Sequence, residues 1–89
     1  MVEKIFTILD DGGLHARPST TLVNAVSSFK SEVMLEYKEK QVNLKSIMGV
    51  MALGVPKGAQ IKVIAKGEDE EQVLQSVSQV MLAQGIGAR

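Results

Sequence analysis

Alternating apolar and polar residues predict four strands along the chain. In the segment VEKIFTIL (2–9), Val2, Phe6 and Ile8 share one side and Ile5 and Leu9 lie on the other, so we expect a strand with both sides partly covered. EVMLEY (32–37) alternates in the same way. The polar segment 38–44 that follows predicts a turn and a short strand, so the two form a hairpin. QIKVIAKG (60–67) alternates again and has one mainly apolar side.

Two helices are predicted in the first two thirds of the chain, the first of them from the helical spacing of Leu22, Val23, Val26 and Phe29. The first begins near Ala16, and Pro18 suits its first turn because a missing N–H has no consequence there. The second covers SIMGVMALG (46–54). Ser46 is a suitable N-cap for it, and Gly54 is a suitable stop.

The longest predicted helix covers residues 68–85, and its apolar stripe consists of Val73, Leu74, Val77, Val80 and Met81. Asp69 is its expected cap, Gln72 completes a capping box, and Gly85 ends the helix. The last residues, 85–89, carry no recognisable chemistry, and we expect them to fray.

The predicted order of elements is βαββαβα. Helices on one face of a four-stranded, mainly antiparallel sheet would form an α+β open-faced sandwich. The chain has 89 residues, which is enough for one domain over residues 1–89 but not for a second core. Only three residues are aromatic, so aliphatic side chains and methionine must build the core.

Charge and composition exclude several classes of function. Ten basic and ten acidic residues leave no net charge to attract nucleic acid or anionic membranes. The absence of cysteine excludes disulfides and cysteine-bound metals. No apolar run approaches the roughly 18 residues that span a bilayer, and the first residues do not resemble a signal peptide. We expect a cytoplasmic protein with no nucleic-acid partner and no membrane insertion.

The only histidine, His15, lies in DDGGLHARPSTTLV (10–23), just before the first predicted helix. The unpaired N–H groups and the dipole of a helix N-terminus attract anions, and Arg17 adds a planar cation that suits phosphate. Gly12 and Gly13 leave room for a tight turn or a partner. These residues describe a nucleophilic imidazole beside a phosphate site. They leave open an ordinary surface histidine, whether a phosphate is bound or carried, and which ring nitrogen reacts.

Two motifs add a resemblance that covers essentially the whole chain. GLHARPST resembles the active-site signature of HPr, the histidine-containing phosphocarrier of the bacterial phosphoenolpyruvate:sugar phosphotransferase system, which serves sugar transport. NLKSIMGVMALGVPKGAQI (43–61) resembles the regulatory-serine motif of the Gram-positive members of that family. The length and the predicted order of elements agree with the same family.

The resemblance implies a carrier of phosphoryl groups with no turnover of its own. His15 would form a phosphohistidine at Nδ1, taking the group from phosphorylated enzyme I and passing it to the enzyme IIA components of sugar permeases. Arg17 would pair with the phosphate, which the backbone N–H groups of Ala16 and Arg17 would hold. No metal and no cofactor are implied for this step, and a monomer is expected.

The serine at position 46 has two interpretations, as a helix cap and as a phosphorylation site. Its position as a helix cap is sufficient to explain a serine there. The resemblance instead implies a phosphoserine made by HPr kinase/phosphorylase. The modified protein would bind catabolite control protein A in carbon catabolite repression, and the phosphoserine would weaken transfer from enzyme I. A phosphate dianion at a helix N-terminus is electrostatically favourable, so both readings suit the position.

The helix around residues 46–54 contains more apolar side chains than its inner face can bury. Exposed methionines beside His15 would form an adaptable docking surface. The resemblance implies a partner interface, with Pro18, Thr20, Lys45, Ile47, Met48 and Met51 as its members.

Two positions depart from the family pattern. Gly12 stands where serine or threonine is frequent, and Ser19 stands where alanine is frequent.

Three alternative functions remain. The first is a regulatory HPr paralogue that lacks the histidine, against which His15 argues. The second is an RNA-binding α/β domain, against which the few aromatic residues and zero net charge argue. The third is an anion-binding module that never forms a phosphohistidine.

Overall fold

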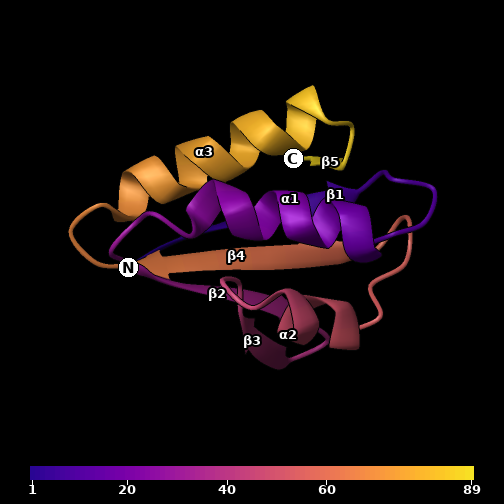
Figure 1. The fold of residues 1–89 in the computed structure, drawn as a ribbon, viewed down its shortest axis with the longest axis horizontal. Helices are drawn as coiled ribbons and strands as arrows, with labels where there is room; N and C mark the ends of the chain where they lie inside the picture. The colour runs from indigo at the N-terminus through magenta and orange to yellow at the C-terminus, as the bar shows by residue number, and fades with distance from the viewer.

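The computed structural model describes residues 1–89 and confirms the predicted order of elements, with one strand added at the end (Figure 1). In chain order the elements are β1 (Val2–Ile8), α1 (Ala16–Val26), β2 (Glu32–Tyr37), β3 (Lys40–Asn43), α2 (Ile47–Ala52), β4 (Gln60–Lys66), α3 (Glu70–Ala83) and β5 (Gly87–Ala88). No helix combines the length and hydrophobicity that crossing a membrane requires.

The strands form one antiparallel sheet in the order β3-β2-β4-β1-β5. The predicted hairpin of β2 and β3 is confirmed. In the centre of the sheet, Val63 of β4 lies opposite Leu35 of β2. Figure 1 shows α1 and α3 running alongside each other over the sheet, and α1 also packs against α2. The fold is therefore the expected open-faced α+β sandwich.

The core lies between the helices and the inner face of the sheet. Alternation along β4 buries Ile61, Val63 and Ala65, while the intervening Lys62 and Ile64 are only partly covered on the open face. The helices contribute the remaining buried apolar side chains, which include Leu22, Val23, Val26, Val50, Val73, Leu74, Val77 and Met81. The apolar spacing along both long helices therefore indicated the buried faces correctly.

The expectation of four strands and a frayed C-terminus is wrong. Ile86 has only 2% of its surface exposed, and β5 pairs with the end of β1. The carbonyl of Ile86 accepts hydrogen bonds from the backbone N–H groups of Leu9 at 2.8 Å and Asp10 at 3.3 Å. A strand of two residues has too few positions to show alternation, so only its contacts reveal it.

The predicted capping box at the start of α3 is also wrong. Asp69 precedes the helix, but its side chain makes no cap hydrogen bond, so no box with Gln72 forms. Its carboxylate accepts hydrogen bonds from the backbone N–H groups of residues 30 and 31 and from the hydroxyl of Ser31. The Ser31 hydroxyl, together with these N–H groups, lowers the pKa of Asp69. Asp69 therefore joins the start of α3 to the start of β2.

Candidate functional site

The loop between β1 and α1 presents His15 at the start of α1. It is held by two backbone hydrogen bonds of 2.9 Å: Gly13 N–H donates to the carbonyl of Asp10, and Leu14 N–H donates to that of Val55. Gly13 has a φ of +68°, a conformation that favours glycine, and Leu14 is buried in the core. The tight turn before His15 is therefore fixed by contacts on both sides.

His15 is the N-cap residue of α1, with an extended backbone and a half-exposed imidazole. Its Nε2 lies 3.0 Å from Oδ1 of Asp10. The Gly12 N–H donates to the same oxygen at 2.9 Å. This hydrogen bond is the main reason that the pKa of Asp10 is lowered, and the hydrogen bond to His15 lowers that pKa further. An ionised carboxylate can only accept, so Nε2 carries the proton. In a neutral ring, this leaves the lone pair of Nδ1 free to attack an electrophile.

The N-terminus of α1 offers free donors next to this ring. The first hydrogen bond within the helix runs from Ser19 N–H to the carbonyl of His15, at 3.1 Å. The N–H groups of Ala16 and Arg17 have no partner in the protein, and Pro18 has no N–H. Two free donors and the helix dipole, equivalent to about half a positive charge, favour an anion here.

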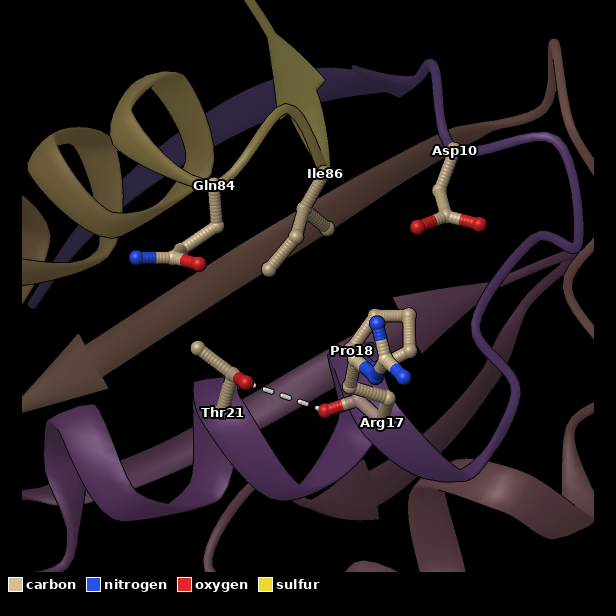
Figure 2. Close-up of a pocket in the computed structure, with 6 residues that line it drawn as sticks. All are labelled: Asp10, Arg17, Pro18, Thr21, Gln84 and Ile86. Carbon is tan, nitrogen blue, oxygen red and sulfur yellow. Dashed lines mark hydrogen bonds between the residues drawn. The ribbon is translucent and has the colours of Figure 1, made fainter.

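A small pocket of about 40 Å³ lies between the loop after β1, the start of α1 and the segment that follows α3 (Figure 2). Asp10 lines it from the loop after β1, and Arg17 lines it from the first turn of α1. The other lining residues are Pro18, Thr21, Gln84 and Ile86. The positive charge of Arg17 contributes to the lowered pKa of Asp10, although the two side chains form no ion pair. The site therefore combines the Arg17 guanidinium, which forms no ion pair, with the Asp10 carboxylate, which already accepts hydrogen bonds.

Ser46 is the N-cap residue of α2, as predicted. It is exposed, and its Oγ accepts a hydrogen bond from Gly49 N–H at 3.0 Å. On the same helix Val50 is buried, whereas Met48 is 82% exposed and Met51 is 42% exposed. Because α2 packs against α1, these methionines lie on the helix neighbouring the one that His15 caps.

The remaining residues of the expected interface are less accessible. Pro18 is buried, and Thr20 and Ile47 are half-buried. Lys45 is also half-buried, and its Nζ donates to the carbonyl of Phe29 at 2.7 Å. Among the residues of the expected interface, Met48 and Met51 therefore provide most of the exposed apolar surface. No group of three or more histidine or acidic side chains lies close enough together to hold a metal ion.

Asp10 is the site residue that the sequence reasoning missed. It lies five residues before His15, and Asp11, the double glycine and Leu14 separate the two. Aspartate often accepts a hydrogen bond from the backbone N–H two residues further on, as Asp10 does from Gly12. An aspartate two residues before a glycine was therefore a signal for a turn here, but the same spacing holds for Asp11 and Gly13, so the sequence did not single out Asp10.

The chain matches the family model described as PTS HPr component phosphorylation site over residues 2–82. It is similar to the histidine-containing phosphocarrier protein of Mycoplasma, with 38% identity, a TM-score of 0.93 and coverage of 97% of this chain and 98% of that one. It is also similar to HPr from Thermoanaerobacter tengcongensis, with 39% identity, a TM-score of 0.89 and coverage of 94% of both chains.

A third similar structure is Crh, the Bacillus subtilis catabolite repression protein, described as a swapped-domain dimer. It has 38% identity and a TM-score of 0.73, with coverage of 94% of this chain and 97% of that one. The family match spans nearly the whole chain, including His15 and Ser46. This chain belongs to the HPr family of phosphocarrier proteins of the phosphotransferase system.

Proposed function

We propose that this protein carries a phosphoryl group on Nδ1 of His15. The observation that carries the proposal is the place of the half-exposed His15 imidazole at the N-terminus of α1, beside the unpaired N–H groups of Ala16 and Arg17. The phosphoryl oxygens would accept hydrogen bonds from the N–H groups of Ala16 and Arg17. The Arg17 guanidinium would pair with the same oxygens as a planar, two-point donor.

The donor in this proposal is phosphorylated enzyme I, and the acceptors are the enzyme IIA components of sugar permeases. Both partners follow from the HPr family. The protein would act as a cytoplasmic monomer of one domain and would have no turnover of its own, because the group it accepts must leave to a second protein. Its binding surface would be centred on Met48 and Met51, whose flexible, polarisable side chains adapt to more than one partner.

The first test is intact-mass spectrometry after incubation with enzyme I, Mg²⁺ and phosphoenolpyruvate. One phosphate that is lost on acid treatment is expected on the wild type and none on the His15→Ala variant. The Lys57→Ala variant is a matched control, because Lys57 is an exposed cation near the site that pairs with Asp11 at 2.7 Å. If an active enzyme I leaves the wild type unmodified, the carrier role is wrong.

A second function is favoured by the exposure of Ser46. We propose that HPr kinase/phosphorylase phosphorylates its Oγ and that the phosphoserine form binds catabolite control protein A. The attached dianion would lie at the N-terminus of α2, where the Gly49 N–H already donates to Oγ. The same charge beside the docking methionines would weaken transfer from enzyme I.

The test of this second role is incubation with the kinase and ATP, followed by acid treatment. Phosphoserine survives acid whereas phosphohistidine does not, so the two modifications are distinguished on one sample. An acid-stable phosphate is expected on the wild type and on His15→Ala, but not on Ser46→Ala. If Ser46→Ala is modified as fully as the wild type, the kinase acts elsewhere.

A further inference from the structure

The carboxylate of Asp10 and the imidazole of His15 form a pair that the carrier role alone does not require. We propose that Asp10 is a positioning residue for phosphoryl transfer. It holds His15 with the proton on Nε2 and stabilises the positive charge that the ring acquires when Nδ1 attacks phosphorus. This inference rests on the proposed function and assigns a role to a residue outside the helix that carries the nucleophile.

Asp10 is held in place before any partner arrives. Its backbone N–H donates to the carbonyl of Ile86 at 3.3 Å, and its own carbonyl accepts from Gly13 N–H at 2.9 Å. Its Oδ1 accepts from Gly12 N–H at 2.9 Å and faces Nε2 of His15 at 3.0 Å. The side chain is mostly covered, so little conformational freedom is lost when it binds the ring. The acceptor is therefore preorganised.

Gly12 makes this pair possible. A Cβ at position 12 would lie 2.6 Å from Cδ2 and 2.9 Å from Nε2 of His15, closer than real Cβ contacts allow. The φ of Gly12 is not positive, so the position requires the absence of a side chain rather than the backbone freedom of glycine. Any larger residue would require the imidazole to shift from the position in which its Nε2 faces Asp10. Gly12 and Asp10 are thus two parts of one arrangement.

The Nδ1 lone pair forms the new N–P bond, while the donor's bond to phosphorus breaks and its electron pair leaves with the donor. The Nε2 proton stays in place, so the ring changes from neutral to positively charged. The Asp10 carboxylate, 3.0 Å from Nε2, stabilises the positive charge on the ring. Because this charge develops only as Nδ1 attacks, the carboxylate stabilises the transition state more than the starting state, and the transfer is faster.

The two neighbouring charges fit this role. Arg17 lines the same small pocket as Asp10, and its guanidinium would offset the repulsion between the carboxylate and an incoming phosphoryl group. The adjacent carboxylate, Asp11, is 94% exposed and forms an ion pair with Lys57. Only one of the two consecutive aspartates therefore contacts the histidine, and the other provides a control of equal charge.

The first measurement is the nitrogen-15 NMR spectrum of the unphosphorylated protein, which reports which ring nitrogen carries the proton. A single Nε2–H form is expected for the wild type and for the Asp11→Ala control. A detectable Nδ1–H fraction is expected for Asp10→Ala and for Gly12→Ser. Asp10→Asn keeps an acceptor oxygen and should retain the Nε2–H form. A wild-type ring with its proton on Nδ1 would overturn the proposal.

The second measurement is the rate of phosphoryl transfer from enzyme I to the same variants, at saturating and at limiting protein. Asp10→Ala should lower kcat about tenfold with little change in KM, as expected for loss of a charge-assisted hydrogen bond. The kcat of Asp10→Asn should lie between that of Asp10→Ala and that of the wild type, because the asparagine oxygen positions the ring but carries no charge. Asp11→Ala should match the wild type.

The outcomes separate the two proposals. If wild type and Asp10→Ala accept phosphate at equal rates, the role of Asp10 is wrong and the carrier function stands. If the wild type accepts no phosphate at all, the carrier function is wrong, and the role of Asp10 fails with it. Should Asp10→Ala not fold, as judged by its circular dichroism, the Asp10→Asn rate and the Gly12→Ser spectrum decide the question.

Discussion

The backbone N–H of Leu14 donates to the carbonyl of Val55 at 2.9 Å, which joins the loop before His15 to the loop after α2. The side chains of both residues are buried, so the connection is shielded from water. The histidine and the helix that carries Ser46 and the exposed methionines are thereby fixed relative to each other. Gly13, which precedes Leu14, makes this junction possible because a side chain there would meet the Val55 carbonyl.

Gly13→Ala should destabilise the fold by roughly 2–4 kcal/mol, because a left-handed alanine and a steric clash both contribute. Its Cβ would lie 2.2 Å from the carbonyl oxygen of Val55. Gly54→Ala is the matched control. Its φ of +64° is similar, but nothing lies within 4 Å of its Cβ, so only the cost of about 1 kcal/mol for the backbone is expected. Urea unfolding measures the free energy of unfolding of both variants. Equal losses of stability would show that the clash with Val55 contributes nothing.

Ile86→Ala tests whether the C-terminal strand is part of the core. Truncating a fully buried isoleucine should lower the free energy of unfolding by roughly 2–4 kcal/mol. Ile5→Ala on the open face of the sheet is the control, since its side chain is 52% exposed and should lose less than about 1 kcal/mol. Denaturant unfolding provides both values. A loss at Ile86 no larger than at Ile5 would show that the strand frays after all.

Asp69 should make stability depend on pH in the acid range. Its pKa is lowered in the folded state from an ordinary value of 3.8, mainly by the Ser31 hydroxyl. The unfolded chain therefore binds more protons, and stability rises with pH in this range. The contribution is present above pH 3.8 and is lost as the pH falls toward the folded-state pKa.

Asp69→Asn should therefore have a lower Tm than the wild type at neutral pH, and the gap should narrow as the pH falls below 3.8. The pKa values of Asp10 and Glu70 are lowered too, so some acid sensitivity should remain in the variant. Thermal unfolding followed by circular dichroism at several pH values provides the comparison. A gap that stays constant with pH would exclude Asp69 as its source.

Arg17→Lys tests whether the phosphate needs a planar cation or only a positive charge. A lysine keeps the charge but cannot donate from two fixed points, so phosphoryl transfer should slow about tenfold. Arg17→Ala should slow it about a hundredfold. Stopped-flow or quenched-flow transfer from enzyme I measures these rates. If lysine restores the full rate, the two-point geometry is unimportant.

Met48→Ser should weaken binding to enzyme I about tenfold, as truncation of a central apolar contact does. Stability should change by less than about 0.5 kcal/mol, because the side chain is 82% exposed. Leu82→Ser is a suitable control, since Leu82 is 68% exposed on α3, outside the proposed docking surface. Calorimetric titration gives the two affinities. If the two substitutions lower the affinity for enzyme I equally, Met48 is not part of a specific docking surface.

The sequence by itself determined the parts of this protein that depend on neighbouring residues. Alternation in 60–67 identified the buried side of β4, and helical spacing identified the buried sides of α1 and α3. The N-cap role of Ser46 followed from its place before an apolar segment. His15 and Arg17 were recognised as a candidate phosphate site because a helix start favours anions whatever the helix packs against.

Only the tertiary structure decided which distant groups meet. The partner of Asp69 is Ser31, from another part of the chain, and this contact replaces the local capping box that the sequence favoured. β5 exists because Ile86 is buried and its carbonyl meets the end of β1, which no pattern within two residues can encode. The same contact fixes the backbone of Asp10, whose carboxylate then faces Nε2 of His15. Local spacing therefore indicated the proposed nucleophile, whereas packing of the C-terminal residues against the end of β1 decided which carboxylate lies against Nε2 of His15.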